Sequence, residues 1–417
     1  MTGRSRRAPV ARRWGSAGGR VPSGRPGRDA VLRWALPIWV VLLAGCTAGG
    51  PPPTPPPPAP VAVAWRAAEP LPVTGGRAAG RALAYCGRWY LTGATIDAAG
   101  GTRPALWTSG DGLAWRAVPV RARSTYGSEH TLYAAACRGG TLVALGAKSG
   151  GAHGYPRTST WSTVGGVLTE EVSAYTLYGG ADGLNVGRVA AGPRGWLLAG
   201  NRVSGAAAWT SPDGASFTLR AAAPLAHDDR RRAWAADAAG VADGWRLVGY
   251  SQGVPATPLA WTSPDGIRWR ELPLRADSHG SGSPERVVAV GGAAVAAGVA
   301  DGTFAAWRID AEAITPLARF ANTAARAVTA TGPPSVAALT AHGSSVLALV
   351  NDGAAAHLWQ STDAGAQWRE QALPAPLPTA AAGGTDLSAS AAGLLLLADD
   401  GGTTHLWGAP APPPGAP

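Results

Sequence analysis

The sequence predicts an all-β protein built as a seven-bladed β-propeller. A tryptophan followed by a turn recurs along the chain at intervals of 46 to 54 residues. Before each tryptophan lie two short strands joined by a tight turn, and a further strand follows most of the turns, so each repeat reads as four strands. Four short strands in roughly 50 residues make one propeller blade. The seven tryptophans are Trp107, Trp161, Trp209, Trp261, Trp307, Trp359 and Trp407.

The two ends of the repeat region complement each other. The last repeat reaches its third strand at Leu406-Trp407 and then runs into proline, so it lacks a fourth strand. Residues 61–68 resemble the fourth strand of other repeats, with Trp65-Arg66 matching Trp115-Arg116. We therefore expect residues 61–68 to be the outer strand of the blade at about 385–408, which would close the ring and cover a free edge. The propeller would span 61–410, followed by a proline-rich tail at 411–417.

The N-terminus has the parts of an export signal. Residues 1–33 are basic, residues 34–43 are apolar, and small residues precede Cys46. The apolar run is shorter than the roughly 20 residues of a membrane-spanning helix, so residues 1–45 read as a signal peptide. Leu43-Ala44-Gly45-Cys46 also resembles the bacterial lipobox. That resemblance implies a lipid on Cys46 and anchoring to the outer leaflet of the cytoplasmic membrane; the alternative is an ordinary signal peptide with a chance cysteine.

A linker and a nearly neutral domain follow. Residues 46–60 comprise the lipidated cysteine and a proline-rich linker. The linker should form an extended polyproline spacer, because proline has no N–H to donate to a sheet. The chain carries a net charge of +10, but residues 1–45 hold nine arginines and one acid, which leaves 27 basic and 25 acidic residues. A domain this close to neutral lacks the basic field of nucleic-acid binding proteins. We expect no nucleic-acid partner and a monomer.

Four turns between third and fourth strands share the form S-x-D-G-x-x-aromatic, one with an extra residue before the glycine. At such positions aspartate closes the turn by accepting backbone N–H groups, and glycine supplies positive φ. Repeats two, five and seven have degenerate turns at Thr163–Gly166, Ile309-Asp310 and Gly408-Ala409. The four turns comprise Ser109, Asp111, Gly112 and Trp115; Ser211, Asp213, Gly214 and Phe217; Ser263, Asp265, Gly266 and Trp269; and Ser361, Asp363, Gly365 and Trp368.

These turns resemble the Asp-box, or bacterial-neuraminidase repeat, of sialidase-like propellers. The resemblance covers the repeat region and implies the fold more than the activity. Sialidases carry an Arg-Ile-Pro motif, three arginines that grip a carboxylate, and a Tyr–Glu nucleophile pair. Arg-Ile-Pro is absent here, its nearest string being Arg308-Ile309-Asp310 in repeat five, and no Tyr–Glu pair can be assigned. The sequence therefore favours a protein without catalytic residues.

Two cysteines remain after Cys46. Cys86 and Cys137 lie 51 residues apart at the same place in repeats one and two. An even pair in an exported chain favours a disulfide over two buried thiols. The histidines are scattered without the spacing of metal ligands, so we expect neither a metal nor another cofactor.

The loops that link successive repeats form the candidate binding face, because loops on a rigid scaffold often carry function. Their arginines, tyrosines and histidine suit an anionic ligand or a glycan, and solvated loops without a role are the alternative. Carboxylates that a glycosidase would need occur there as Glu129, Asp182, Asp228, Asp229, Asp277 and Glu285, with nothing to rank them. The candidate binding residues are Arg121, Arg123, Tyr126, Tyr175, Tyr178, Arg230, Arg231, Arg232, Arg275 and His279.

We accordingly predict a membrane-anchored extracytoplasmic lipoprotein whose propeller binds an envelope glycan or a partner protein without catalysis. One alternative is a divergent sialidase-like glycoside hydrolase. The other is an assembly factor for another exported protein.

Overall fold

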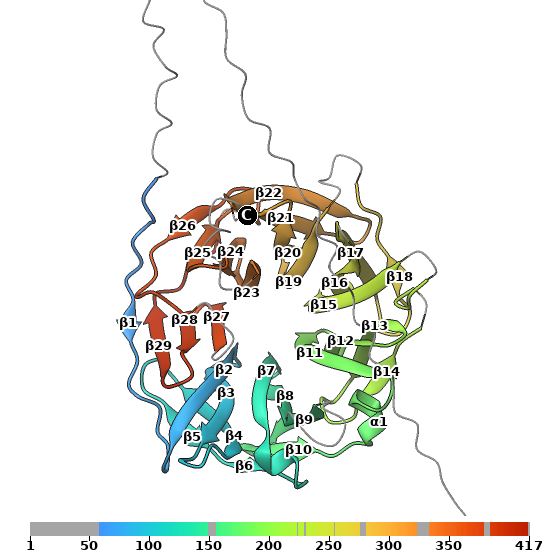
Figure 1. The fold of residues 1–417 in the computed structure, drawn as a ribbon. Helices are drawn as coiled ribbons and strands as arrows, with labels where there is room; N and C mark the ends of the chain where they lie inside the picture. The colour runs from blue at the N-terminus through green and yellow to red at the C-terminus, as the bar shows by residue number, and fades with distance from the viewer. Residues whose placement is uncertain are drawn as a thin grey trace, which may run out of the picture. The chain divides into compact units, whose positions relative to one another are not determined.

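The computed structural model shows seven small sheets arranged in a ring, so the predicted seven-bladed propeller is confirmed (Figure 1). No helix among the described residues is long and apolar enough to cross a membrane. The signal peptide, Cys46, Arg230 and His279 lie outside the described residues. The described ranges are 58–148, 156–222, 224–228, 231–253, 255–275, 281–322, 333–378 and 384–415.

Each blade is an antiparallel sheet whose first strand lines the ring centre and whose last strand lies outside. Blade one contains β2 (Arg77–Tyr85), β3 (Trp89–Ile96), β4 (Thr102–Ser109) and β5 (Arg116–Val118). Blade two contains β7 (Thr131–Arg138), β8 (Thr141–Lys148), β9 (Arg157–Val164) and β10 (Val167–Glu171). Blade three contains β11 (Gly183–Gly192), β12 (Gly195–Arg202), β13 (Gly205–Ser211) and β14 (Thr218–Arg220). Blade four contains β15 (Arg232–Val241), β16 (Gly244–Gln252), β17 (Thr257–Ser263) and β18 (Arg270–Glu271).

The remaining blades follow the same order. Blade five contains β19 (Ser283–Val290), β20 (Ala293–Ala300), β21 (Thr303–Ile309) and β22 (Ile314–Asn322). Blade six contains β23 (Ser335–His342), β24 (Ser345–Asn351), β25 (Ala356–Ser361) and β26 (Arg369–Gln371). Blade seven contains β27 (Gly384–Ser390), β28 (Gly393–Asp399) and β29 (Thr404–Ala409), with β1 (Arg66–Ala67) outside them. Two single-turn helices, η1 (Gly127–Glu129) and α1 (Tyr175–Tyr178), lie in the loops around blade two.

Blade two departs from the predicted four strands. An additional strand, β6 (Val120–Arg121), pairs in parallel with β10 and gives this blade five strands. Arg121 of the predicted binding face is therefore part of a sheet edge. The sequence gives little sign of it, because a two-residue pairing has no periodicity to read.

The core lies between neighbouring blades. The recurring tryptophans of the first five blades are at most 1% exposed. In one apolar cluster, Trp245 and Trp261 of blade four pack with Leu197 of blade three. Because the first two strands of most blades are rich in alanine, glycine and valine, adjacent sheets approach closely and bury the large rings between them.

The ring is closed by the N-terminal strand, as predicted, although the paired stretch is shorter than 61–68. Arg66 pairs with Gly408 and Ala67 with Trp407, which makes β1 the outer strand of blade seven. Residue Val61 instead bridges Gln371 of blade six, and the Trp65 indole donates to the Ala372 carbonyl at 2.8 Å. Residues 61–67 therefore run along the outer edge of blade six and then along that of blade seven (Figure 1).

The C-terminal tail also returns to blade six. The Pro414 carbonyl accepts the Ser344 N–H at 2.6 Å, and the Pro413 carbonyl accepts the Ser345 hydroxyl at 2.5 Å. Both ends of the described chain thus contact blade six.

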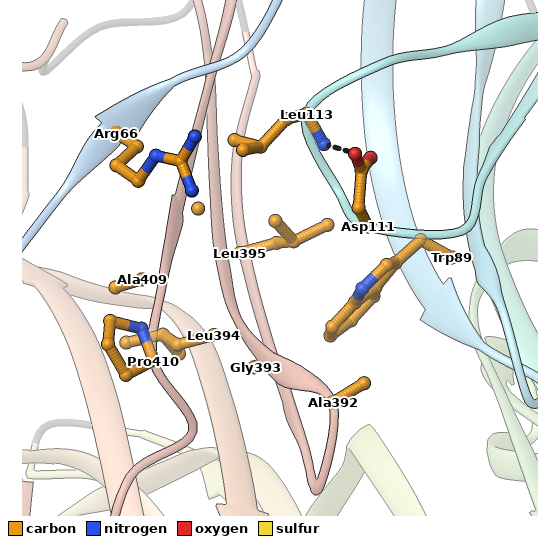
Figure 2. A pocket seen from close by; sticks show the side chains of 11 residues that line it. Arg66, Trp89, Asp111, Leu113, Ala392, Gly393, Leu394, Leu395, Ala409 and Pro410 are labelled. Carbon is orange, nitrogen blue, oxygen red and sulfur yellow. Dashed lines mark hydrogen bonds between the residues drawn. The ribbon is translucent and has the colours of Figure 1, made fainter.

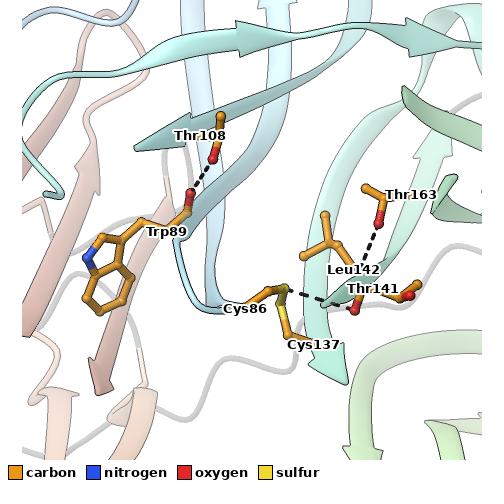
Figure 3. Close-up of a disulfide and its surroundings, with 7 residues drawn as sticks. All are labelled: Cys86, Trp89, Thr108, Cys137, Thr141, Leu142 and Thr163. Atoms are coloured by element: carbon orange, nitrogen blue, oxygen red, sulfur yellow. Dashed lines mark hydrogen bonds between the residues drawn. A yellow bond between two sulfur atoms is a disulfide. The ribbon is translucent and has the colours of Figure 1, made fainter. Parts of the chain in front are cut away.

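A disulfide joins Cys86, directly after β2, to Cys137 on β7 (Figure 3). The two Cα atoms are 5.4 Å apart, within the usual range for a bridge. Each cysteine stands at the end of the first strand of its blade, so the bridge crosses from blade one to blade two near the ring centre.

Candidate functional site

The four S-x-D-G turns are built as structural elements. In the turn of blade three, Asp213 Oδ1 accepts the N–H groups of Ala215 and Ser216 at 2.9 and 3.0 Å and the Ser211 hydroxyl at 2.7 Å. The Ser211 oxygen in turn accepts the Gly214 N–H at 2.8 Å, and Gly214 has φ +78°. Hydrogen bonds, first that from Ser216, lower the pKa of Asp213. The turns of blades one and four repeat this bonding, and in blade six Asp363 Oδ1 accepts the Ser361 hydroxyl and the Gln367 N–H, so these aspartates serve the fold.

The ring encloses a central cavity of about 220 Å³ that is lined by the first strand of all seven blades. Four charged side chains line it, from blades three, four, five and seven. They are Arg188, Asp237, Arg286 and Asp386. We call them the channel quartet.

The quartet occupies one level of the ring. In blade three, Trp209 pairs with Leu198 of the second strand, and Arg188 pairs with the next residue, Ala199. The pairs Asp237–Val248, Arg286–Ala297 and Asp386–Leu397 have the same register in their blades. The other three blades place Ala82, Ala134 and Ala338 at this level. Small residues on three sides leave the space into which the four charged chains extend.

The two quartet aspartates accept backbone donors on both oxygens. The Asp237 carboxylate accepts the N–H groups of Ala238 at 2.8 Å and Val287 at 3.1 Å. The Asp386 carboxylate accepts those of Leu387 at 2.9 Å and Leu83 at 2.7 Å. One bond of each aspartate reaches the next blade, so these side chains join blade four to five and blade seven to one.

Burial raises the pKa of both quartet aspartates. For Asp237 the charges of Arg188 and Arg286 act in the opposite direction without cancelling the effect. For Asp386 the Leu83 N–H and the Arg188 charge oppose it. Although both side chains line the cavity, protein surrounds them, so loss of hydration dominates.

The two quartet arginines differ in their partners. Arg286 donates to the carbonyls of Ala337 at 3.1 Å and Glu285 at 2.8 Å, and burial, with repulsion from Arg188, lowers its pKa to about 10. Arg188 makes no hydrogen bond or close ion pair with any residue that the structure describes. A guanidinium with free donors in a partly dehydrated cavity is suited to a carboxylate or another planar anion.

Of the predicted binding face, the structure brings Tyr126 and Tyr175 together. The Arg157 guanidinium lies between them, 4.0 Å from the Tyr175 ring centroid and 4.9 Å from that of Tyr126. Both rings remain exposed, by 47% for Tyr126 and 37% for Tyr175. Arg157 was not predicted, since a strand arginine without a motif gives no signal.

Other predicted face residues have structural roles. Tyr178 is 5% exposed and its ring packs against Trp209, so it lies in the blade rather than on the loop surface. The reason is that α1 turns its last residue toward the blade. Arg231 makes a bidentate ion pair with Glu271, and Arg123 lies 3.9 Å from Glu171. Arg232 and Arg275 are exposed at the ends of their segments.

The carboxylates offered by the loops are also engaged. Glu129 pairs with Lys148 at 2.5 Å, Asp182 lies 3.8 Å from Arg202, and Glu285 accepts the Val336 N–H at 2.7 Å. Asp228 lies 3.7 Å from Arg231, whereas Asp229 and Asp277 lie outside the described residues. No cluster of three or more His, Cys, Asp or Glu suited to a metal occurs in the described part of the chain.

Sequence reasoning missed the channel quartet, although a signal exists. Each quartet residue lies seven positions before the first residue of the next strand, as Arg188 does before Gly195. Aligning the repeats on that turn places two arginines and two aspartates in one column of otherwise small residues. Charge within a small-residue inner strand is the feature to search for.

No family model matches the chain, and no curated protein matches it. Among solved structures, it is similar to an extracellular domain assigned to a one-component system of B. thetaiotaomicron, at 12% identity and a TM-score of 0.46, covering 82% of this chain and 39% of that one. It is also similar to the propeller domain of the Trilobed protease from Pyrococcus furiosus, at 7% identity and a TM-score of 0.44, covering 81% and 94%. A third is an α-L-arabinofuranosidase from Fusarium graminearum, at 12% identity and a TM-score of 0.40, covering 65% and 89%. Likeness of this degree carries nothing about ligand or activity.

Proposed function

We propose that the propeller is a non-catalytic binding module for an acidic envelope glycan, held in the central channel. The observation that carries this proposal is that the Arg188 guanidinium lines the channel without a hydrogen-bond partner among the described residues. The quartet offers two positive charges, and Arg286 is held in place by backbone carbonyls. A glycan carboxylate that reached Arg188 would gain a charge-assisted bidentate contact in a site with little competing water.

The bonding of the quartet aspartates supports binding without catalysis. Both oxygens of Asp237 and of Asp386 already accept backbone N–H groups, and one of the two bonds of each aspartate connects adjacent blades. Because both oxygens of each carboxyl are taken up by backbone donors, these side chains serve the structure of the ring, which favours binding over a role as nucleophile.

We further propose that the chain is exported and anchored as a lipoprotein, and that its S-x-D-G turns make it a member of the Asp-box propellers. The support is the signal-like N-terminus, Cys46 and the hydrogen bonding of the four turns. Metabolic labelling with an alkyne fatty acid should tag the native chain, and Cys46→Ser should lose the tag and leave the membrane fraction. An untagged native chain would refute the anchor.

Binding is tested by calorimetric titration with glucuronate- or sialate-terminated oligosaccharides and their neutral counterparts. Arg188→Ala should weaken binding of the acidic sugars by at least about tenfold, since removing a desolvated charge contact costs about 2 kcal/mol or more. Arg116→Ala, a change at an exposed arginine on β5, is the matched control. Equal affinity for acidic and neutral sugars would contradict the proposal.

A divergent glycoside hydrolase is the second candidate, because two carboxyls of raised pKa line one channel. A raised pKa is the usual property of a catalytic acid. Release of reducing sugar by the purified chain, abolished by Asp386→Asn, would favour the hydrolase over the binding module.

A further inference from the structure

A second cavity lies where the ring closes. It has a volume of about 220 Å³ and is set between blades seven and one, away from the central channel (Figure 2). Leu394, Leu395 and Trp89 form its floor, and Arg66 and Asp111 stand at its edge. The floor side chains are at most 3% exposed, so the cavity is apolar below and charged above.

The cavity follows from the way the ring closes. In blade one, Arg116 pairs with Thr108 and Ala117 with Trp107, and the S-x-D-G turn joins these two strands. In blade seven, Arg66 and Ala67 take the same register against Gly408 and Trp407, but the two strands come from opposite ends of the chain. No turn connects them. Arg66 and residues 408–410, the two sides of the missing turn, both line the cavity.

The described ends of the chain do not fill this space. Residues Pro413 and Pro414 are bonded to Ser345 and Ser344 on blade six. Upstream, Val61 is bonded to the edge of the same blade. An occupant must therefore come from outside the described chain.

The polar groups at the edge define what would fit. The Arg66 guanidinium makes no hydrogen bond or ion pair within the part of the chain that the structure describes. The Asp111 Oδ1 atom accepts three donors, from Leu113, Ala114 and Ser109, whereas its Oδ2 takes none of them. The hydrogen bonds from Ala114 and Leu113 lower the pKa of Asp111, so the free oxygen carries charge at neutral pH. One cationic and one anionic group thus flank an apolar floor.

We propose that this closure pocket binds a small apolar zwitterion of the α-amino acid class. Its carboxylate pairs with Arg66, its ammonium group pairs with Asp111, and its side chain enters the apolar floor. Size agrees with this ligand, because an apolar protein cavity of about 150 Å³ is enough for benzene. The site uses none of the channel quartet, so it stands or falls independently of glycan binding.

The test uses the full-length chain with Cys46→Ala, so that no acyl group competes for the pocket. Calorimetry or ligand-observed NMR compares L-phenylalanine with glycine, N-acetylphenylalanine and phenylalaninamide. We expect phenylalanine to bind, glycine not to bind, and each blocked analogue to bind about threefold or more weakly, as for a solvent-exposed ion pair. Arg66→Ala should weaken phenylalanine to the level of phenylalaninamide, whereas the exposed Arg116→Ala on β5 should leave its affinity unchanged.

A second variant guards against a general effect on folding, since Arg66 belongs to the closing strand. Ala392→Trp adds an indole at the cavity wall without touching β1, and should abolish phenylalanine binding while the melting temperature stays near that of the parent chain. The proposal is overturned if phenylalanine binds no better than glycine. It is equally overturned if the blocked analogues bind as well as phenylalanine, or if Arg66→Ala or Ala392→Trp keeps the parent affinity.

Discussion

Removing residues 1–68 should open the ring and cost the domain much of its stability. The deletion cuts the β1–β29 pairing and four hydrogen bonds beyond it, two at Val61, one at Trp65 and one at Ala68. At about 1 kcal/mol for each of the four bonds, and about 2 kcal/mol for the half-buried Trp65 ring, the loss is about 6 kcal/mol. That loss is a large part of the free energy of unfolding of a folded domain, which is typically about 5–15 kcal/mol.

The assay is thermal unfolding followed by tryptophan fluorescence and circular dichroism. A chain that begins at Pro58 keeps every one of these contacts and is the control. The shorter chain, beginning at Glu69, should melt roughly 10 °C lower and over a broader range, because an open ring loses the cooperativity of its blades. A peptide of residues 58–68 added in trans should restore part of the difference. Coincident melting curves for the two chains would show that β1 does not close the ring, and would refute the reasoning.

Further predictions concern the disulfide, the turns and the channel. The Cys86→Ser, Cys137→Ser chain should lose about 4 kcal/mol in urea titrations, from the entropy of a loop of about 50 residues, and a reductant should then have no further effect. Asp213→Ala should cost about 1–2 kcal/mol through three lost hydrogen bonds, where Ala215→Ser, a change in the same turn that keeps them, should be nearly neutral. Because the folded pKa of Asp213 is lowered, its contribution is present above pH 4, approximately, and is lost as the pH falls, so Asp213→Asn should flatten the acid limb of the stability curve. Asp386→Ala should cost about 2 kcal/mol by leaving the buried Leu83 N–H without an acceptor, and unchanged stability would contradict that role.

The fold was predictable because its signals are local and repeated. Each of the seven recurring tryptophans lies on the third strand of a blade, and each S-x-D-G turn is closed by hydrogen bonds among its own residues. Ring closure was predictable from the match of Trp65-Arg66 to Trp115-Arg116, and the paired registers agree. The bridge from Val61 to blade six was not, because it depends on where the extended segment crosses the outer surface rather than on any residue preference.

The candidate site was less predictable, for a reason that lies in the geometry of a ring. Loop residues such as Arg231 and Tyr178 looked functional because they are polar or aromatic, yet one pairs with Glu271 and the other is buried against Trp209. Polarity in a loop does not distinguish a ligand contact from a contact within the fold.

The channel quartet shows the opposite case. Arg188 and Asp386 lie 198 residues apart, and nothing near either one in the sequence suggests a common site. They meet only because seven blades bring their first strands to one axis, and that requires the closing strand to be in place. The same Asp386 that lines the cavity accepts the Leu83 N–H across the seam between blades seven and one. Ligand binding in the channel and closure of the ring therefore share a residue, and a ligand that holds the quartet together should also raise the melting temperature of the closed ring.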